Sequence, residues 1–443
     1  MLTIHTSPHF LPEKEYIFHV LFREMLGVAF QIVLDVAEPN YRIHLPNGAE
    51  LVVENHGWKP GASHLPPTPD AISGAIPHPF QVGDTVIGLY GRPHFSVETQ
   101  RIECGLDLFA SAFFMLTRWE EDAPRHYDKH GRFPADKSLA AQANFLHRPV
   151  VNEWADLLWQ MLQRLGWQPP RPKRHFQLSV SCDVDHPRLW WSASDRLRTL
   201  AGAVFKRSDL QEVHYFIKNH LFRKKDPFDI FDEWLDLLEQ QQLVAQFNFL
   251  GARPRKSDCW YPLEHPFIKN LMEKIARRGH RIGFHPSYES FENQDRFVHE
   301  LASLRAISPL EITSGRQHYL RFAAPGTWRV WQAAGLIFDS TVGYPEAEGF
   351  RCGICHDYPV FDVTQRKMLA LREKPLLAMD VTLAQYRHYS PEQAATRLEQ
   401  LRREVTKHGG EFTLLWHNSS WNTPFWEPWK KVFLDFVAGQ QQR

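Results

Sequence analysis

The stretch Ser179–His186, Ser-Val-Ser-Cys-Asp-Val-Asp-His, constrains the fold more than any other part of the chain. It follows an apolar alternation that starts at Phe176 and is typical of a strand. Two carboxylates and an imidazole therefore gather where this strand ends, which is the usual place for chemistry in parallel α/β proteins. We expect a loop to begin near Asp183, so that Asp183 and Asp185 face one metal ion or substrate. The alternative is an ordinary turn in which an Asp caps the next helix.

A proline-rich segment marks the predicted domain boundary. Residues 166–175, Gly-Trp-Gln-Pro-Pro-Arg-Pro-Lys-Arg-His, place three prolines within four positions, which excludes a helix or a central strand. We predict a linker there, between an N-terminal α+β domain of residues 1–165 and a second domain of residues 176–443. A chain of 443 residues is long enough for two large cores.

The N-terminal domain mixes strand and helix patterns. Residues 41–53 contain Asn47-Gly48 between two apolar runs, which predicts a hairpin. Residues 107–121 are apolar on nearly every side until a charged end, which predicts a buried helix. We expect the charged residues at that end to form an internal salt bridge rather than to carry chemistry.

Strand and helix patterns alternate beyond the linker. Repeated β-then-α units predict a parallel sheet, open or closed into a barrel. Five polar residues fall at the carboxyl ends of predicted strands, namely Asp183, His285, Asp339, Asp380 and His417. In a barrel these ends meet on one face.

The segment Gly283–Glu289 offers a candidate metal-ligand pair. His285 and Glu289 are four residues apart, and on a helical turn this spacing brings an imidazole and a carboxylate to one side, where they suit a divalent ion. The alternative is that His285 is only hydrogen-bonded at its strand end.

Two further segments carry candidate site residues. Residues 315–322 are rich in planar donors, which suit a carboxylate, a phosphate or an oxyanion; the alternative is a solvated charged loop. Residues 412–416 are predicted to form an apolar strand that ends at His417. A histidine there can protonate a leaving group while a carboxylate opposite takes a proton from water.

The order of these motifs resembles the polysaccharide deacetylase family, the metal-dependent NodB-like carbohydrate esterases. The resemblance covers about residues 175–438 and implies an α/β fold, a distorted seven-stranded (β/α) barrel. It implies Asp183 as general base and His417 as catalytic acid. It also implies Asp185, His285 and Glu289 as ligands of a divalent metal ion.

The resemblance assigns supporting roles as well. Arg316 or Arg321 corresponds to the arginine that steadies the base. Apart from the resemblance, Arg351 directly precedes Cys352–His356, and we expect it to reach an anionic sugar. The residues expected to support catalysis or bind substrate are His186, Arg316, His318, Arg321, Asp339, Arg351, Trp416 and Asn418.

Two positions depart from the family pattern. The acids are separated by Val184 rather than adjacent, and Glu289 stands where the family has its second metal-binding histidine. One His, one Asp and one Glu suit Zn²⁺ best, with Mn²⁺, Co²⁺ or Ni²⁺ as alternatives.

The chain is most similar to a bacterial polysaccharide-biosynthesis branch of this family that shares the strings Asp-Val-Asp-His, Arg-Gln-His-Tyr-Leu-Arg, Asp-Ser-Thr and Trp-His-Asn. This implies a cytoplasmic, metal-dependent deacetylase, an amide hydrolase acting on an N-acylated sugar or glycan in surface-polysaccharide biosynthesis. Two alternatives stay open: a barrel that binds glycan or organises a biosynthetic complex without hydrolysis, and a sugar-modifying enzyme of different chemistry. Nothing in the sequence indicates an oligomeric state.

Composition excludes several classes of protein. The formal net charge is zero, which argues against a general nucleic-acid binder. No apolar stretch is long enough for a transmembrane segment, and no signal-peptide pattern precedes the first domain, so we expect a cytoplasmic protein. Cys352–His356 matches the spacing of c-type haem attachment and of redox or zinc sites, but without an export signal we expect reduced thiols in a loop beside the site.

Overall fold

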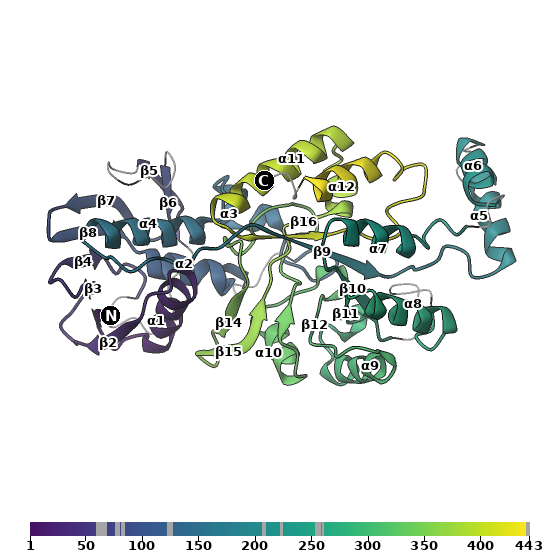
Figure 1. Ribbon diagram of the computed structural model, residues 1–443. Coiled ribbons are helices and arrows are strands. Elements are labelled where there is room, and N and C mark those ends of the chain that lie inside the picture. The colour runs from purple at the N-terminus through teal and green to yellow at the C-terminus, as the bar shows by residue number, and fades with distance from the viewer. Residues whose placement is uncertain are drawn as a thin grey trace.

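Two large β-sheets organise the chain in the computed structural model, one from the N-terminal part and one from the C-terminal part (Figure 1). The structure describes residues 1–58, 69–75, 80, 85–121, 127–205, 210–221, 225–252, 258 and 261–439. No helix in these ranges is long and apolar enough to cross a membrane.

The N-terminal sheet has the strand order β2-β1-β3-β4-β8-β7. Its hairpin turns at Gly48, whose φ of 85° costs little in a residue without a Cβ, so the predicted hairpin is confirmed. The strands are β1 (Leu2–Thr6), β2 (Phe30–Leu34), β3 (Tyr41–His44), β4 (Glu50–Val53), β7 (Gly91–Val97) and β8 (Arg101–Leu106), with β5 (Ile72–Ala75) and β6 (Thr85–Gly88) in a separate ribbon.

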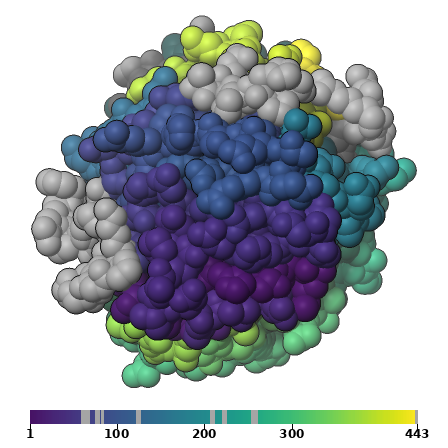
Figure 2. Space-filling model, turned by 90° about the vertical axis from the view of Figure 1, so that its left-hand side faces the viewer, coloured from purple at the N-terminus to yellow at the C-terminus, as the bar shows by residue number. Residues whose placement is uncertain are grey.

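The helices that accompany this sheet are strongly apolar. All residues of α2 (Leu108–Leu116) are buried, and the Asp107 side chain caps the helix by accepting a hydrogen bond from the Ala110 N–H at 2.9 Å, which confirms the buried helix. The other helices are α1 (Leu11–Phe18), which continues as a π-helical segment (His19–Met25), α3 (Leu139–Gln142) and α4 (Val150–Arg164). Figure 2 looks onto the end of the molecule that the N-terminal residues cover.

The C-terminal sheet has the order β14-β15-β13-β12-β11-β10-β9-β17-β16, in which every neighbouring pair is parallel except β14 with β15. The strands are β9 (Gln177–Val184), β10 (Gln246–Leu250), β11 (Arg281–His285), β12 (Ser314–Gly315), β13 (Phe338–Asp339), β14 (Tyr358–Asp362), β15 (Lys367–Glu373), β16 (Ala378–Met379) and β17 (Glu411–Leu415). The helices are α5 (Ala193–Phe205), α6 (Leu210–Phe216), α7 (Phe231–Gln240), α8 (Pro266–Arg277), α9 (Gln294–Ile307), α10 (Gly326–Ala333), α11 (Pro391–Lys407) and α12 (Trp429–Ala438). The predicted alternation of strands and helices is therefore present.

The predicted closed seven-stranded barrel is not confirmed, because the structure shows a nine-stranded sheet whose end strands, β14 and β16, are not paired with each other in the described ranges. The sheet is nevertheless strongly curved. In a flat sheet, β15 and β16 would lie roughly 34 Å apart at about 4.8 Å per strand. Residues 374–377 alone connect them, and such a connection reaches roughly 17 Å. The curvature draws the carboxyl ends of the parallel strands together.

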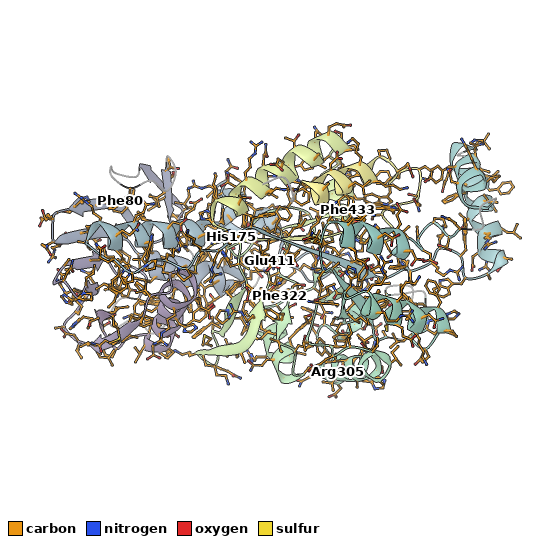
Figure 3. All side chains as sticks on the ribbon, in the orientation of Figure 1. Phe80, His175, Arg305, Phe322, Glu411 and Phe433 are labelled. Carbon is orange, nitrogen blue, oxygen red and sulfur yellow. The ribbon has the colours of Figure 1, made fainter. Side chains whose placement is uncertain are left out.

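The two parts of the chain share one hydrophobic core. The hydroxyl of Tyr16 donates to the Pro359 carbonyl at 2.9 Å, and its ring lies 4.9 Å from that of Phe361. Residues 166–175 form neither helix nor strand; the division into two domains at this segment stays a prediction. Figure 3 shows His175, at the end of this segment, close to the middle of the molecule.

A buried ion network also joins the two parts. Glu121 accepts from Arg118 Nε at 2.8 Å and from Arg351 Nη2 at 2.6 Å, and all three side chains are at most 3% exposed. The predicted internal salt bridge is therefore confirmed. Arg351, expected near a sugar, lies instead inside this network, because Glu121 neutralises its charge there.

This network generates a stability prediction. Glu121→Ala should leave two buried guanidinium groups without their shared partner and lower the free energy of unfolding by about 3–5 kcal/mol. Chemical denaturation followed by tryptophan fluorescence measures the change. The control is Glu239→Ala, which removes an exposed partner of Arg278 and should cost about 1 kcal/mol or less. Similar losses in both variants would contradict a special contribution of the buried network.

Candidate functional site

Asp183 and Asp185 lie on one side of the end of β9. The strand ends at Val184 and a loop begins at Asp185, so the expectation that a loop begins near Asp183 is confirmed. Residues two apart along an extended backbone point to the same face, and Asp185 comes two residues after Asp183. Val184 is buried in the main core, while both carboxylates line a cavity of about 250 Å³ at the ends of the strands.

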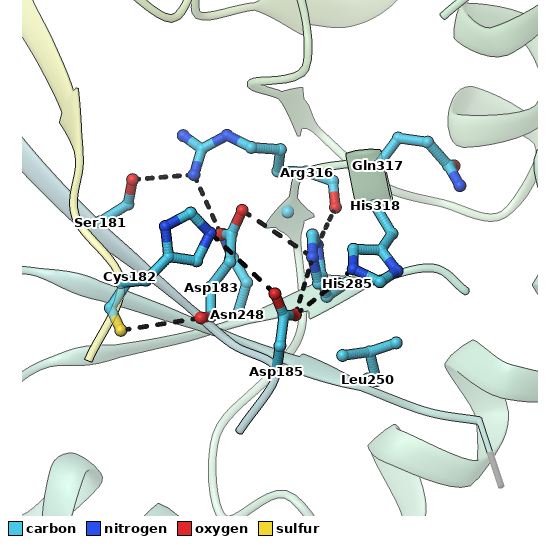
Figure 4. Close-up of polar contacts among 12 residues, drawn as sticks. Ser181, Cys182, Asp183, Asp185, Asn248, Leu250, His285, Arg316, Gln317 and His318 are labelled. Carbon is cyan, nitrogen blue, oxygen red and sulfur yellow. Dashed lines mark hydrogen bonds and ion pairs between the residues drawn. The ribbon is translucent and has the colours of Figure 1, made fainter. Parts of the chain in front are cut away.

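Two donors fix one oxygen of Asp183 (Figure 4). Its Oδ1 accepts from Arg316 Nη1 at 3.0 Å and from Asn248 Nδ2 at 2.7 Å. Arg316 Nη1 also donates to Ser181 Oγ at 2.9 Å. Burial alone would raise the pKa of Asp183, but the Arg316 guanidinium and nearby imidazoles hold that pKa below its ordinary value. Asp183 is therefore a carboxylate at neutral pH, with Oδ2 free of these two donors.

Three imidazoles surround Asp185. His285 Nε2 lies 3.4 Å and His318 Nε2 lies 3.7 Å from Asp185 Oδ1. His417 Nε2 lies 4.0 Å from Asp185 Oδ2, on the other oxygen. Burial would raise the pKa of Asp185, but His318 and His285 outweigh it and hold that pKa well below its ordinary value.

The other ring nitrogen of each histidine has its own anchor. His285 Nδ1 lies 2.6 Å from the Arg316 carbonyl oxygen. His318 Nδ1 lies 3.1 Å from Asp258 Oδ1, and His417 Nδ1 lies 2.8 Å from Asp380 Oδ1. Such partners fix the orientation of the ring and direct Nε2 to the site.

The carboxylates control the charge of two of these rings. Burial would lower the pKa of His318, but Asp185 and Asp258 raise it to about 9. Burial would likewise lower the pKa of His417, and Asp380 raises it to about 9. Without a bound cation both rings are therefore protonated at neutral pH.

Asp185, His285 and His318 fit a divalent metal ion. Their donor atoms all lie within 4.8 Å of one another. Donors of a tetrahedral ion with bonds of about 2.0–2.2 Å are roughly 3.3–3.6 Å apart, close to the separations of 3.4 and 3.7 Å. In the part of the chain that the structure describes, Asp185 Oδ1 and His285 Nε2 are buried without a hydrogen-bond partner, as expected of atoms reserved for a cation.

Glu289 does not join this group, contrary to the sequence expectation. It lies in a one-turn helix, Tyr288–Ser290, and forms an ion pair with Arg296 while 47% of its side chain is exposed. Pro286 follows His285 directly, so no continuous helix places residue 289 over residue 285. His318 takes the third position instead.

The cavity contains further predicted residues and several that the sequence did not suggest. His186 and His318 line it, whereas Trp416 and Asn418 do not. Asn418 donates to the His186 carbonyl at 2.9 Å, and the Trp416 ring packs 5.2 Å from Phe433, so both support neighbouring backbone. The lining residues are Arg132, Asp183, Asp185, His186, Asp258, His285, Gln317, His318, Tyr319, Leu320, Pro345, Met379, Val381, Tyr386, Leu415 and His417.

Three predicted features lie away from the cavity. Of the two candidate arginines, Arg316 contacts Asp183, whereas Arg321 packs against the Tyr288 ring at 4.3 Å. Asp339 is fully buried at the end of β13 and accepts from the Thr341 N–H at 3.0 Å. The thiols of Cys352–His356 are buried, and the Cys355 N–H donates to Asn152 Oδ1 at 3.0 Å. That loop therefore packs on α4 and does not border the cavity.

The sequence reasoning missed two partners of the site. Asn248 stands between Phe247 and Phe249 in β10, and a polar side chain at that point of an apolar strand was an available signal. Asp258 lies outside regular secondary structure, and no local pattern distinguishes it. Asp380 was recognised only as a strand-end residue, not as the anchor of His417.

Comparisons with known proteins are distant. Residues 2–166 match a family of unknown function (DUF7033), and no curated protein matches the chain. Among solved structures, the chain is similar to a putative polysaccharide deacetylase from Mycobacterium smegmatis, with 16% identity and a TM-score of 0.38 over 62% of this chain and 87% of that chain. A probable polysaccharide deacetylase from Pseudomonas aeruginosa PAO1 is also similar, with 12% identity and a TM-score of 0.39 over 63% of this chain and 91% of that chain. A CE4 family pseudoenzyme from Bacillus anthracis has 8% identity and a TM-score of 0.32 over 62% of this chain and 63% of that chain.

The ligand set generates a prediction about metal binding. His318→Ala should weaken Zn²⁺ binding by at least about 100-fold, and Asp258→Asn by about 10–100-fold, because the first loses a donor and the second loses the anchor of that donor. Glu289→Ala, the matched control, should bind as the unaltered protein does. Competition with a chromophoric chelator measures the affinities. Strong loss in Glu289→Ala with none in His318→Ala would restore the ligand set expected from the sequence.

The buried Asp339 generates a prediction about pH. Burial raises its pKa to about 7 despite hydrogen bonds from Thr341, and burial followed by repulsion from Asp339 raises the pKa of Glu373. A raised pKa stabilises the folded state below about pH 4, and this contribution is lost as the pH rises through about 7.

Asp339→Asn should therefore lose less stability between pH 5 and pH 8 than the unaltered protein, by up to about 1.4 kcal/mol per pH unit. Denaturation at a series of pH values measures the difference. The control is Asp236→Asn, because the Asp236 side chain is 63% exposed; its pH slope should match that of the unaltered protein. Equal pH slopes for Asp339→Asn and the unaltered protein would show that Asp339 is ionised in the folded state.

Proposed function

We propose that this protein is a metal-dependent hydrolase that removes an acyl group from the nitrogen of a sugar or glycan. The observation that carries the proposal is one cavity with three parts: the ligand group Asp185, His285 and His318, the ionised Asp183 beside it, and the protonated His417. Hydrolysis of an amide needs a proton acceptor for water and a proton donor for the departing amine. Asp183 and His417 supply these two groups.

Asp183 is the general base. Arg316 and Asn248 both hold its Oδ1, so Oδ2 is the oxygen left to accept a proton. Oδ2 lies 3.8 Å from His285 Nε2, on the side of the ligand group. The two donors thus direct the basic oxygen to the place where water must be activated.

His417 is the general acid. Asp380 holds its Nδ1 and also accepts from its backbone N–H at 2.9 Å, so Nε2 is the nitrogen that points into the cavity. The ring is 15% exposed. It faces Asp185 Oδ2, whereas the two ligand histidines face Oδ1. It can therefore deliver a proton to an amine leaving on that side.

Asp185, His285 and His318 would hold the metal ion. A bound divalent cation lowers the pKa of water to about 7 and polarises a carbonyl group. Two imidazoles and one carboxylate suit Zn²⁺ best, with Co²⁺, Ni²⁺ or Mn²⁺ as further candidates. The order of motifs that resembles the polysaccharide-biosynthesis branch supports an N-acylated glycan of a bacterial surface polysaccharide as the substrate.

The test is acetate release. The protein, treated with chelator and reloaded with Zn²⁺, Co²⁺ or Mn²⁺, should release acetate from oligomers of N-acetylglucosamine or from nucleotide-linked N-acetyl sugars. Asp183→Asn should lower kcat by about 10²–10⁴-fold and leave the metal bound, because Asp183 is not in the ligand group.

Glu289→Gln is the control and should retain full activity. Loss of metal together with activity in Asp183→Asn would contradict its role as base. Failure of the metal-loaded protein to release acetate from any N-acetylated sugar would favour a glycan-binding protein without hydrolysis.

A further inference from the structure

The residues beside the ligand group have an unusual backbone. Tyr319 and Leu320 follow His318 directly and have φ angles of 59° and 53°. Residues with a Cβ rarely adopt this left-handed backbone conformation. Two of them in succession persist only where contacts with the surrounding structure stabilise that conformation. Tyr319 is 38% exposed and lines the cavity, so the strained segment presents an aromatic ring to the site.

Arg132, from the N-terminal part of the chain, holds this segment. Its Nη1 donates to the Tyr319 carbonyl at 2.9 Å. Asp128 fixes the guanidinium through contacts at 2.8 Å to Nε and 2.6 Å to Nη2. Arg132 is 5% exposed and lines the same cavity. Because Asp128 balances its charge, Arg132 acts here as a rigid hydrogen-bond donor rather than as a binding site for an anion.

A second set of contacts clamps the same N-terminal loop. Arg321 Nε donates to the His130 carbonyl at 2.8 Å, and its Nη1 donates to the Tyr288 carbonyl at 2.6 Å. The His130 ring lies 5.0 Å from the Tyr319 ring, and His130 Nδ1 lies 3.2 Å from the Tyr288 hydroxyl. Residues 128–132 are therefore held against residues 319–321 by contacts on both sides of Tyr319.

We propose that residues 128–132 form one wall of the substrate site, and that Arg132 is a positioning residue that holds Tyr319 as a stacking surface for a sugar ring. A pyranose ring has one apolar face and a rim of hydroxyls, and a tyrosine beside polar donors matches both. Tyr386, 44% exposed on the same cavity, provides a second ring. The inference deepens the proposed function, since it assumes that the cavity receives a glycan.

The test measures glycan binding separately from turnover. In the full-length Asp183→Asn protein loaded with Zn²⁺, calorimetry with the tetramer of N-acetylglucosamine gives Kd. Adding Arg132→Ala should raise Kd at least about tenfold, because a charged donor to a backbone carbonyl is lost. In the otherwise unaltered protein, the same change should raise KM much more than it lowers kcat.

Matched variants separate positioning from general stability. Arg148→Ala removes an arginine that is held in the same way, by Glu153 and by a backbone carbonyl, but lies outside the cavity, so Kd and KM should not change. Tyr319→Ala should reproduce the loss of affinity. Arg132→Lys keeps one donor and should recover part of the affinity, and it serves as the main test if Arg132→Ala does not fold.

The outcomes distinguish this inference from the proposed function. An unchanged Kd in folded Arg132→Ala and Tyr319→Ala proteins overturns the inference even if acetate is released. The inference is also overturned if the parental protein does not bind the tetramer. A tenfold loss of affinity in Arg132→Ala without acetate release from the unaltered protein supports the inference and overturns the hydrolase function.

Discussion

The ion pair between Arg316 and Asp183 is the interaction on which the site depends. It joins two strand ends at 3.0 Å in the protein interior, and Arg316 Nε also donates to the Ser340 carbonyl at 2.9 Å. The Arg316 carbonyl oxygen in turn anchors His285 at 2.6 Å. Arg316 thus fixes both Asp183, the proposed base, and one metal-ligand candidate. A shift of any of these strands would leave a buried charge unpaired, which costs several kcal/mol, so the curvature of the sheet and the geometry of the site are maintained together.

The charges of the site are arranged in alternating shells around Asp185. Three imidazole Nε2 atoms face its two oxygens, and beyond two of them stand the further carboxylates Asp258 and Asp380. In the absence of a cation, protons on His318 and His417 balance these carboxylates. A divalent ion held by His318 would displace the proton of that ring, whereas His417 faces the other oxygen of Asp185 and would keep its own. In the proposed mechanism, the same arrangement provides two rings for a metal ion and one for proton transfer.

Sequence alone predicted well the strand ends at the site. β11 and β13 end at His285 and Asp339, and Asp183, Asp380 and His417 lie within two residues of a strand end. It failed where contacts depend on strand pairing. The spacing of His285 and Glu289 suggested one helical face, but the chain bends at Pro286, and the partner came from residue 318, brought close by the pairing of β11 with β12. The expected loop near Asp183 is present, since β9 ends at Val184 and Asp185 is the first residue beyond it. Asp258 has no local pattern and becomes a site residue only through the tertiary fold.

The N-terminal part of the chain is built into the site rather than appended to it. Its contacts with the C-terminal sheet occur at three levels: the apolar contact of Tyr16 with Phe361, the ion pair of Glu121 with Arg351, and the hydrogen bond of Arg132 to the Tyr319 carbonyl. The first two bury surface and charge that neither part can cover alone, and the third reaches the cavity. The hydrogen bond of Arg132 depends on the rigid placement that the other two contacts give to the N-terminal part. A loop that stabilises a strained backbone must itself be fixed in place, which explains why the interface between the two parts is extensive.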